Sequence, residues 1–275
     1  MKDKLKGLTK VIMFKYFFTH KSYLPSDISG KLFSPLHIIF AVVIATCVIL
    51  LAIFLRKINV KKIKILFICI WVVTLVLEVA KILWETFSGP DGFYVGGYLP
   101  LYPCSIFMYV MPFIIWCKKE SFCYKSASGY LCTIGFIGAL VNFIYPQNVL
   151  SNYPCYTFAG LHTLIYHALM LFVVLLLLLS KQYDYKKITD GFLALIPLFI
   201  TAIPATIVNY LCNASYLFLR GGIFPFSAIH AAMPEALYVV LMIVGYFLAS
   251  FIFYLPYWIA KRIKKSKSKS LPQDF

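Results

Sequence analysis

The stretch KILFICIWVVTLVLEVAKILW, residues 64–84, is almost wholly apolar over a length that can cross a membrane. A helix of roughly 20 such residues spans the ~30 Å of hydrocarbon in a bilayer. An open sheet in the same place would leave backbone groups without hydrogen-bond partners in lipid. The stretch therefore predicts a transmembrane helix. Glu78 and Lys81, near its end, need an explanation because a charge in hydrocarbon costs about 2.5–3.5 kcal/mol or more.

Six further apolar runs accompany this one. Hydrophobic residues make up 61% of the 275 residues and charged residues only 13%, whereas about 25% of the residues in a soluble domain are charged. We therefore predict an all-α fold, a polytopic membrane helical bundle with about seven transmembrane helices. The predicted spans are residues 37–55, 64–84, 98–116, 127–145, 158–180, 191–210 and 236–259.

The spans predict a single membrane domain, residues 37–259, between two basic tails. Residues 260–275 form the basic cytoplasmic tail, and residues 1–36 form the basic N-terminal tail. Within the N-terminal tail, residues 4–18 carry apolar residues at helical spacing with interspersed lysines, which predicts an interfacial amphipathic helix. No short apolar core precedes a small-residue cleavage site, so we expect no removable signal peptide.

The formal net charge is +16. The basic residues crowd the loops and tails, where anionic headgroups attract them at roughly 1 kcal/mol each. No basic helix face with interleaved aromatic residues is present, so a nucleic-acid partner is not expected. Membrane lipids are the expected partners, and the sequence does not indicate an oligomeric state.

Basic residues occupy every second loop. They gather in residues 56–64, 118–125, 181–187 and 261–269, while residues 87–97, 146–157 and 211–235 are nearly free of charge. By the positive-inside rule, this alternation predicts a cell-membrane protein with its N-terminus outside and its C-terminus in the cytoplasm. The basic N-terminal tail conflicts with this orientation, but the six internal loops agree with one another.

Polar side chains inside the predicted spans lie toward the outer ends. Glu78 and Lys81 are three residues apart and can pair on one helix face. Asn142 and Asn209 lie near the outer ends of the fourth and sixth spans. The pattern predicts a polar cavity in the outer half of the bundle. The alternative is a structural polar cluster that locks helices together.

Cys104 and His167 fall at comparable depths, roughly 9 and 13 Å below the outer edge at 1.5 Å per residue, so they can meet across a bundle. Pro100 suits a first helical turn. That would place Cys104 near a helix N-terminus, where unpaired N–H groups and the dipole stabilise a thiolate. A thiolate is a nucleophile when a base lies close, and His167 is the candidate base. A cysteine that fills space and a hydrogen-bonded core histidine are the alternative reading.

No metal site and no cofactor are expected. His162 and His167 are five residues apart and therefore point roughly 140° apart on a helix. They do not form the i,i+4 pair that binds a metal ion. The cysteines show no CxxC pairing, so a zinc ribbon or a redox dithiol is not indicated.

Several motifs resemble the YwaF-like integral membrane proteins, which have a multi-spanning animal relative that acylates ether phospholipids. The most specific is LPLYPC, residues 99–104, which resembles the family's Leu-Pro-Leu-His-x-Cys signature. FSPLH, residues 33–37, looks like the family's opening, and His167 looks like the histidine of its fifth span. The chain departs from the signature at Tyr102, where histidine is common, and at Ser105, where aspartate is common.

The resemblance implies a membrane-embedded acyltransferase or thiol hydrolase with Cys104 as the nucleophile and His167 as the base. An oxyanion donor could come from Tyr102, Ser105 or Asn142. The side chains expected to line or support the cavity are Glu78, Lys81, Tyr102, Ser105, Asn142 and Asn209.

Two other classes of function remain open from the sequence. Pro197 and Pro204 interrupt the sixth span, and the outer loops are rich in Gly and Pro. Broken helices of this kind occur in transporters, which favours a small-solute or lipid transporter. The third class is a receptor or assembly factor without chemistry. A retinal-binding photoreceptor is disfavoured because span 236–259 contains no lysine for a Schiff base.

Overall fold

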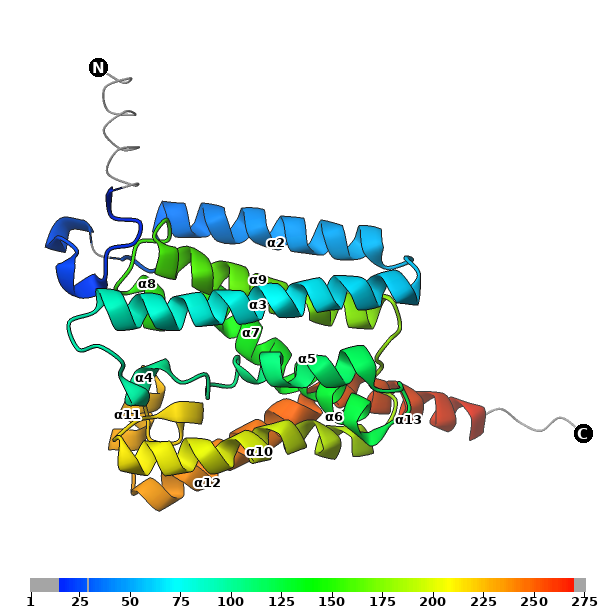
Figure 1. The fold of residues 1–275 in the computed structure, drawn as a ribbon. Helices are drawn as coiled ribbons and strands as arrows, with labels where there is room; N and C mark the ends of the chain where they lie inside the picture. The colour runs from blue at the N-terminus through cyan, green and yellow to red at the C-terminus, as the bar shows by residue number, and fades with distance from the viewer. Residues whose placement is uncertain (1–14, 29, 270–275) are drawn as a thin grey trace, which may run out of the picture.

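The computed structural model describes residues 15–28 and 30–269, and all the regular elements in these residues are helical (Figure 1). Most of the predicted amphipathic helix, residues 4–18, lies outside the described residues. Six helical segments are long and apolar enough to cross a membrane, and a shorter apolar helix accompanies them. The predicted membrane helical bundle is therefore confirmed. The six segments are Pro35–Leu55, Val60–Ser88, Phe122–Leu150, Phe158–Leu179, Thr189–Leu211 and Glu235–Ile263.

Four of these segments are single α-helices, and the other two are composite. The first two are α2 (Pro35–Leu55) and α3 (Val60–Ser88), and the fifth-span and sixth-span helices are α9 (Phe158–Leu179) and α10 (Thr189–Leu211). The fourth-span segment joins α6 (Phe122–Tyr130), the π-helical η3 (Leu131–Gly135), α7 (Phe136–Ile144) and α8 (Gln147–Leu150). The last joins α12 (Glu235–Phe251), η5 (Ile252–Tyr254) and α13 (Leu255–Lys269).

Polar side chains fix where several helices begin. The Ser34 side chain accepts a hydrogen bond from the backbone N–H of His37, and Pro35 occupies the first turn of α2. Asn59 caps α3 in the same way, and Thr157 caps α9. Each cap satisfies one of the N–H groups that a helix start leaves free. The sequence thus sets these boundaries locally.

The predicted span 98–116 is not one helix. A short helix, α4 (Val95–Tyr98), is followed by non-helical backbone, and α5 (Ile106–Trp116) begins only afterwards. Pro100 was expected in a first helical turn, and that expectation is wrong. Pro100 and Pro103 lack N–H donors, and each disfavours the α conformation in the residue before it. The chain therefore unwinds between α4 and α5.

The loops divide between the two ends of the bundle, as an alternating topology requires. The α2–α3, α5–α6 and α9–α10 connections lie at the end where the C-terminus leaves (Figure 1). Elements α4, α8, α11 (Phe226–Ala231) and the N-terminal segment lie at the opposite end. The lysine-rich loops therefore gather at one end, here called the basic end.

Residues 15–28 and 30–34 pack onto the end opposite the basic end. The backbone N–H of Phe158 donates to the carbonyl of Phe17 at 2.9 Å, and Trp84 Nε1 donates to the carbonyl of Phe18 at 2.8 Å. His20 Nε2 lies 3.3 Å from Glu85 Oε2. This part of the predicted N-terminal tail is therefore held against the end of α3 and the start of α9.

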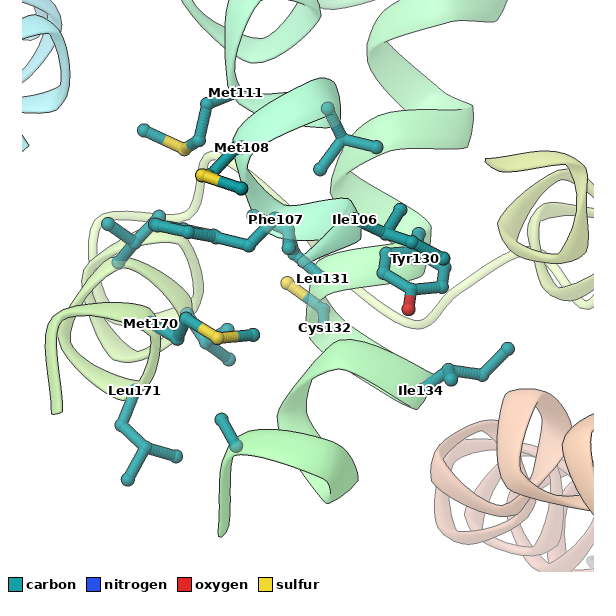
Figure 2. Close-up of a cluster of buried hydrophobic side chains, with 14 of the residues drawn as sticks. Ile106, Phe107, Met108, Met111, Tyr130, Leu131, Cys132, Ile134, Met170 and Leu171 are labelled. Atoms are coloured by element: carbon teal, nitrogen blue, oxygen red, sulfur yellow. The ribbon is translucent and has the colours of Figure 1, made fainter. Parts of the chain in front are cut away.

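Helix α9 is the centre of the core. It is buried along most of its length, whereas α2 and α12 expose most of their side chains. Met170 from α9 belongs to the same buried cluster as Phe107 and Met108 of α5 and Cys132 of η3 (Figure 2). Exposed apolar side chains on α2, such as Val43 and Leu50, face outward as expected for lipid contact.

Helices α6 and α10 approach closely through small residues. A Cβ atom built on Gly129 would lie 3.3 Å from both Ala194 Cβ and the carbonyl oxygen of Asp190. The Ser126 hydroxyl donates to the carbonyl of Leu193 at 2.8 Å. Small residues and interhelical hydrogen bonds are what holds helices together in lipid, where apolar burial gives no advantage.

Gly129→Val is expected to push α6 away from α10 and to lower the free energy of unfolding by about 1–3 kcal/mol through overpacking. Gly138→Val is the matched control, because no atom lies within 4 Å of a Cβ built there. Thermal unfolding of the purified protein in mild detergent measures the effect. Equal losses for both variants would show that the α6–α10 contact is not specifically tight.

Candidate functional site

The break in the third predicted span is the centre of the candidate site. Residues 99–105, here called the broken segment, have no helical hydrogen bonds along most of their length. Non-helical backbone is tolerated at membrane depth only where protein or a water-filled cavity satisfies it. Tyrosine hydroxyls from three helices donate to its carbonyls: Tyr109 to Pro100 at 3.0 Å, Tyr130 to Pro103 at 2.7 Å and Tyr166 to Cys104 at 3.4 Å.

A fourth tyrosine holds the start of the broken segment. Tyr216, in η4 (Tyr216–Phe218), accepts from the backbone N–H of Leu99 at 2.9 Å and donates to the carbonyl of Val95 at 2.6 Å. Asn209 fixes Tyr216 in turn, since its amide binds both the N–H and the carbonyl of that residue, at 2.6 and 2.9 Å. Asn209 is 1% exposed. Asn209 therefore supports the broken segment indirectly, by holding Tyr216 in position.

Cys104 lies just before the N-terminus of α5. Helix α5 has 11 residues and is therefore about 16 Å long, which places Cys104 about half way across the hydrocarbon. The Cys104 side chain is partly exposed. Ser105 is buried and its hydroxyl does not cap α5. The ring of Tyr102 packs edge-on against Tyr216, with centroids 5.0 Å apart.

A charged cluster lies on α3 and α9. Lys81 Nζ lies 2.5 Å from Glu78 Oε1, so the ion pair that the i,i+3 spacing predicted is present. The other carboxylate oxygen, Oε2, lies 3.8 Å from His162 Nε2. Glu78 and His162 are buried, while Lys81 is 29% exposed. Glu78 therefore links a lysine on its own helix to a histidine on another.

Tyr166 joins this cluster to Cys104 and His167. Its ring stacks on His162 with centroids 5.8 Å apart and meets His167 edge-on at 5.6 Å. Its hydroxyl binds the Cys104 carbonyl, as described above. Tyr166 thus contacts both histidines of α9 with its ring and the Cys104 backbone with its hydroxyl.

The hydrogen bonds of His167 define its tautomer. Nδ1 lies 2.7 Å from the carbonyl oxygen of Thr163, which can only accept, so Nδ1 carries the proton. Nε2 is then an acceptor, and it is buried with no partner among the described residues. This is the state that a general base requires. No hydrogen bond joins Cys104 to His167 in the part of the chain that the structure describes.

The structure also bears on two expectations from the sequence, one for Asn142 and one for a metal site. Asn142 donates to the carbonyl of Gly138 on its own helix at 2.9 Å and does not bind the cluster. In residues 15–28 and 30–269, no three His, Cys, Asp or Glu side chains are grouped to hold a metal ion.

His162 was not among the predicted site residues, because its partner Glu78 lies 84 positions away and no local pattern joins the two.

The site therefore combines a largely buried cysteine, a helix N-terminus beside it, and a buried imidazole whose acceptor nitrogen has no partner among the described residues. Such a set of groups can form and break an acyl–sulfur bond. A broken membrane helix next to a charged cluster can also bind a polar group in transit.

The TMEM164 family model matches residues 32–262. This range includes the broken segment, the charged cluster and all six candidate membrane spans almost completely. It also covers the motifs that resemble YwaF-like proteins, although the matching family carries the TMEM164 name. Neither the curated proteins nor the solved structures contain a match to the chain.

Glu78→Gln is expected to lower the free energy of unfolding by about 1–3 kcal/mol, because it leaves the partly buried Lys81 without a counter-charge. The double variant Glu78→Gln/Lys81→Gln should recover at least half of that loss. Chemical unfolding in detergent micelles measures both. Glu120→Gln, an exposed loop change, is the control, and a double variant no more stable than Glu78→Gln alone would refute the coupling.

Proposed function

We propose that this chain, which belongs to the TMEM164 family, transfers or removes fatty acyl groups on lipids inside the bilayer. The observation that carries the proposal is the position of Cys104. It lies in non-helical backbone about half way across the membrane, partly exposed, directly before a helix N-terminus. A lipid ester that enters the bundle from the membrane would meet a nucleophile there.

The geometry supports an activated thiol. The N-terminal end of α5 carries the positive end of the helix dipole, which stabilises a thiolate. The Tyr166 and Phe107 hydrogen bonds to the Cys104 carbonyl fix the backbone from which the thiol projects. A positioned nucleophile gains rate because the orientation is already set before the substrate arrives.

In the proposed reaction, His167 Nε2 takes the proton of the Cys104 thiol as sulfur attacks the ester carbonyl carbon. The tetrahedral intermediate collapses, the ester C–O bond breaks, and the alcohol leaves with the proton from His167. The acyl group is now a thioester on Cys104. Attack by the hydroxyl of a second lipid, or by water, breaks the C–S bond and returns the proton to sulfur.

The developing oxyanion needs a hydrogen-bond donor. Asn142 already donates to its own helix. Tyr102 and Ser105 lie on either side of Cys104 in the broken segment, so they are the donors that we assign. Asn209 supports the site by holding Tyr216, and the Glu78–Lys81 ion pair faces His162.

Cys104→Ala is expected to abolish formation of a thioester with a lipid-like, thiol-reactive acyl probe. His167→Ala should slow that reaction by about 10²–10⁴-fold, the usual contribution of a general base. Labelling is measured by in-gel fluorescence of the purified protein, with and without hydroxylamine. Cys117→Ala, a partly exposed cysteine at the other end of α5, is the matched control.

Labelling that persists in Cys104→Ala would remove the proposal. If His162→Ala slows the reaction while His167→Ala does not, the base is the histidine that Glu78 faces, and the assignment of His167 is wrong.

The second candidate is a lipid or small-solute transporter, and the broken segment favours it. Discontinuous helices beside charged groups form the substrate sites of many transporters. Lipid scrambling or solute uptake by vesicles that hold the purified protein tests this candidate. Transport that survives both Cys104→Ala and His167→Ala would favour it over acyl transfer.

We also propose that the basic end faces the cytoplasm of the cell membrane, because the positive-inside rule and the segregation of the loops agree. Single cysteines introduced on a cysteine-free background test the orientation. Asn148→Cys is expected to react with a membrane-impermeant maleimide in intact cells, and Lys118→Cys only after permeabilisation. Both positions are exposed loop-end residues, so the reverse result would invert the topology.

A further inference from the structure

Three ionisable side chains lie on one face of α3 near the end of the helix. Glu78, Lys81 and Glu85 follow one another at spacings of three and four residues, which places them on the same side. Glu85 is 17% exposed and Lys81 is 29% exposed, whereas Glu78 and its partner His162 are buried. A row of polar groups therefore leads from the end opposite the basic end down to the charged cluster.

The surroundings of Cys104 differ on the side of the basic end. Helix α5 runs from Cys104 toward that end, and its buried side chains, such as Met108 and Met111, are all apolar (Figure 2). The buried hydroxyls of Ser128 and Thr133 on the neighbouring segment donate to carbonyls of that same segment. Buried water needs free polar partners. Water therefore has its polar route to Cys104 from the end opposite the basic end.

Residues 15–28, here called the strap, lie at the start of this route (Figure 1). His20 of the strap is 4% exposed. Its Nδ1 accepts from the backbone N–H of Ser22 at 3.3 Å, so the proton of the neutral ring lies on Nε2, 3.3 Å from Glu85 Oε2. The rings of Trp84 and Tyr153 have centroids 6.2 and 6.3 Å from the imidazole. His20 therefore occupies a socket beside the first polar group of the row.

Aromatic rings connect the strap to the charged cluster. Phe17 and Phe18 contact Phe158, with ring centroids 6.5 and 5.5 Å away. Trp84 meets the same ring at 5.3 Å. His162 lies one turn further along α9, and its ring centroid is 6.1 Å from that of Phe158. The strap thus supplies two of the rings that pack on the outer side of the cluster.

One buried side chain anchors the strap. Apart from His20, no residue of the strap is buried. The carbonyls of Phe17 and Phe18 accept the two hydrogen bonds described above, and the backbone N–H of Lys21 donates to the Tyr153 hydroxyl at 3.2 Å. A segment with so few buried contacts opens at a low cost in free energy. The strap can therefore open while the helices stay folded.

We propose that the strap keeps water from the acylated Cys104 and so selects the acceptor of the acyl group. This inference rests on the proposed reaction. With the strap closed, the hydroxyl oxygen of a lipid from the bilayer attacks the thioester carbonyl carbon, the C–S bond breaks, and the hydroxyl proton passes through His167 to sulfur. With the strap open, water reacts in the same way and releases a free fatty acid. Lids protect other reactive intermediates by excluding water.

His20 is a positioning residue in this scheme, because it holds the strap and touches none of the reacting atoms. The test uses the full chain in nanodiscs that contain a phospholipid with one fluorescent acyl chain and a lysophospholipid as acceptor. Chromatography separates the labelled fatty acid from the labelled acceptor lipid. His20→Ala should raise the ratio of fatty acid to transferred product about five- to tenfold, the population shift expected when one anchoring contact is lost.

Two further variants complete this test. Trp84→Phe removes the hydrogen bond to the Phe18 carbonyl but keeps an aromatic ring, and it should shift the ratio in the same direction. Ser22→Ala changes an exposed side chain of the same strap and should leave the ratio unchanged. An unchanged ratio in His20→Ala, or an equal loss of both products, would overturn the proposal.

A second measurement reports access without the reaction. On a cysteine-free background, His162→Cys places a thiol beside Phe158. Its modification by a membrane-impermeant methanethiosulfonate should be about five- to tenfold faster when His20→Ala is added, and unchanged when Ser22→Ala is added. Cys132, retained as the single cysteine, is buried in η3 and should stay unreactive in each variant.

The two measurements separate this inference from the proposed reaction. Equal modification rates with and without His20 would show that the strap does not cover the cluster, which would overturn the inference even if Cys104 is acylated. Absence of any product that depends on Cys104 would refute the proposed reaction and the choice of acceptor with it. The modification rates would then still show whether the strap controls access to the cluster.

Discussion

The backbone of residues 99–105 must find hydrogen-bond partners where there is no water, and the centre of the bundle is arranged around this requirement. A helix satisfies its own N–H and C=O groups, but the broken segment cannot, because Pro100 and Pro103 interrupt it. Tyrosines on α5, α6 and α9 and in η4 supply the missing partners. Each tyrosine is itself an apolar ring with one polar tip, so it can be buried among helices without leaving an unpaired group of its own.

These tyrosines also bring distant parts of the chain together. Tyr216 reaches the broken segment only because Asn209 holds the turn after α10. Tyr166 reaches Cys104 from α9 and at the same time stacks on His162, which faces Glu78 on α3. Tyr130 stands where α6 passes into the π-helical η3, a distortion often found at functional sites. The tyrosines that support the backbone are therefore in contact with the side chains that could react.

Helix α2 lies outside this connected centre. Helix α2 contributes little to the buried core and exposes most of its length, so its hold on the bundle comes from its contacts with α9.

The sequence by itself determined the class of the protein, the membrane segments, the division of the loops and the Glu78–Lys81 pair, because hydropathy, loop charge and i,i+3 spacing are local properties of the chain. Only the tertiary structure decided that His162 faces Glu78, that Tyr166 binds the Cys104 carbonyl, and that Tyr216 holds the start of the broken segment. These facts depend on contacts between residues tens of positions apart. The spacing of residues within one helix does not predict which side chain of another helix will lie opposite.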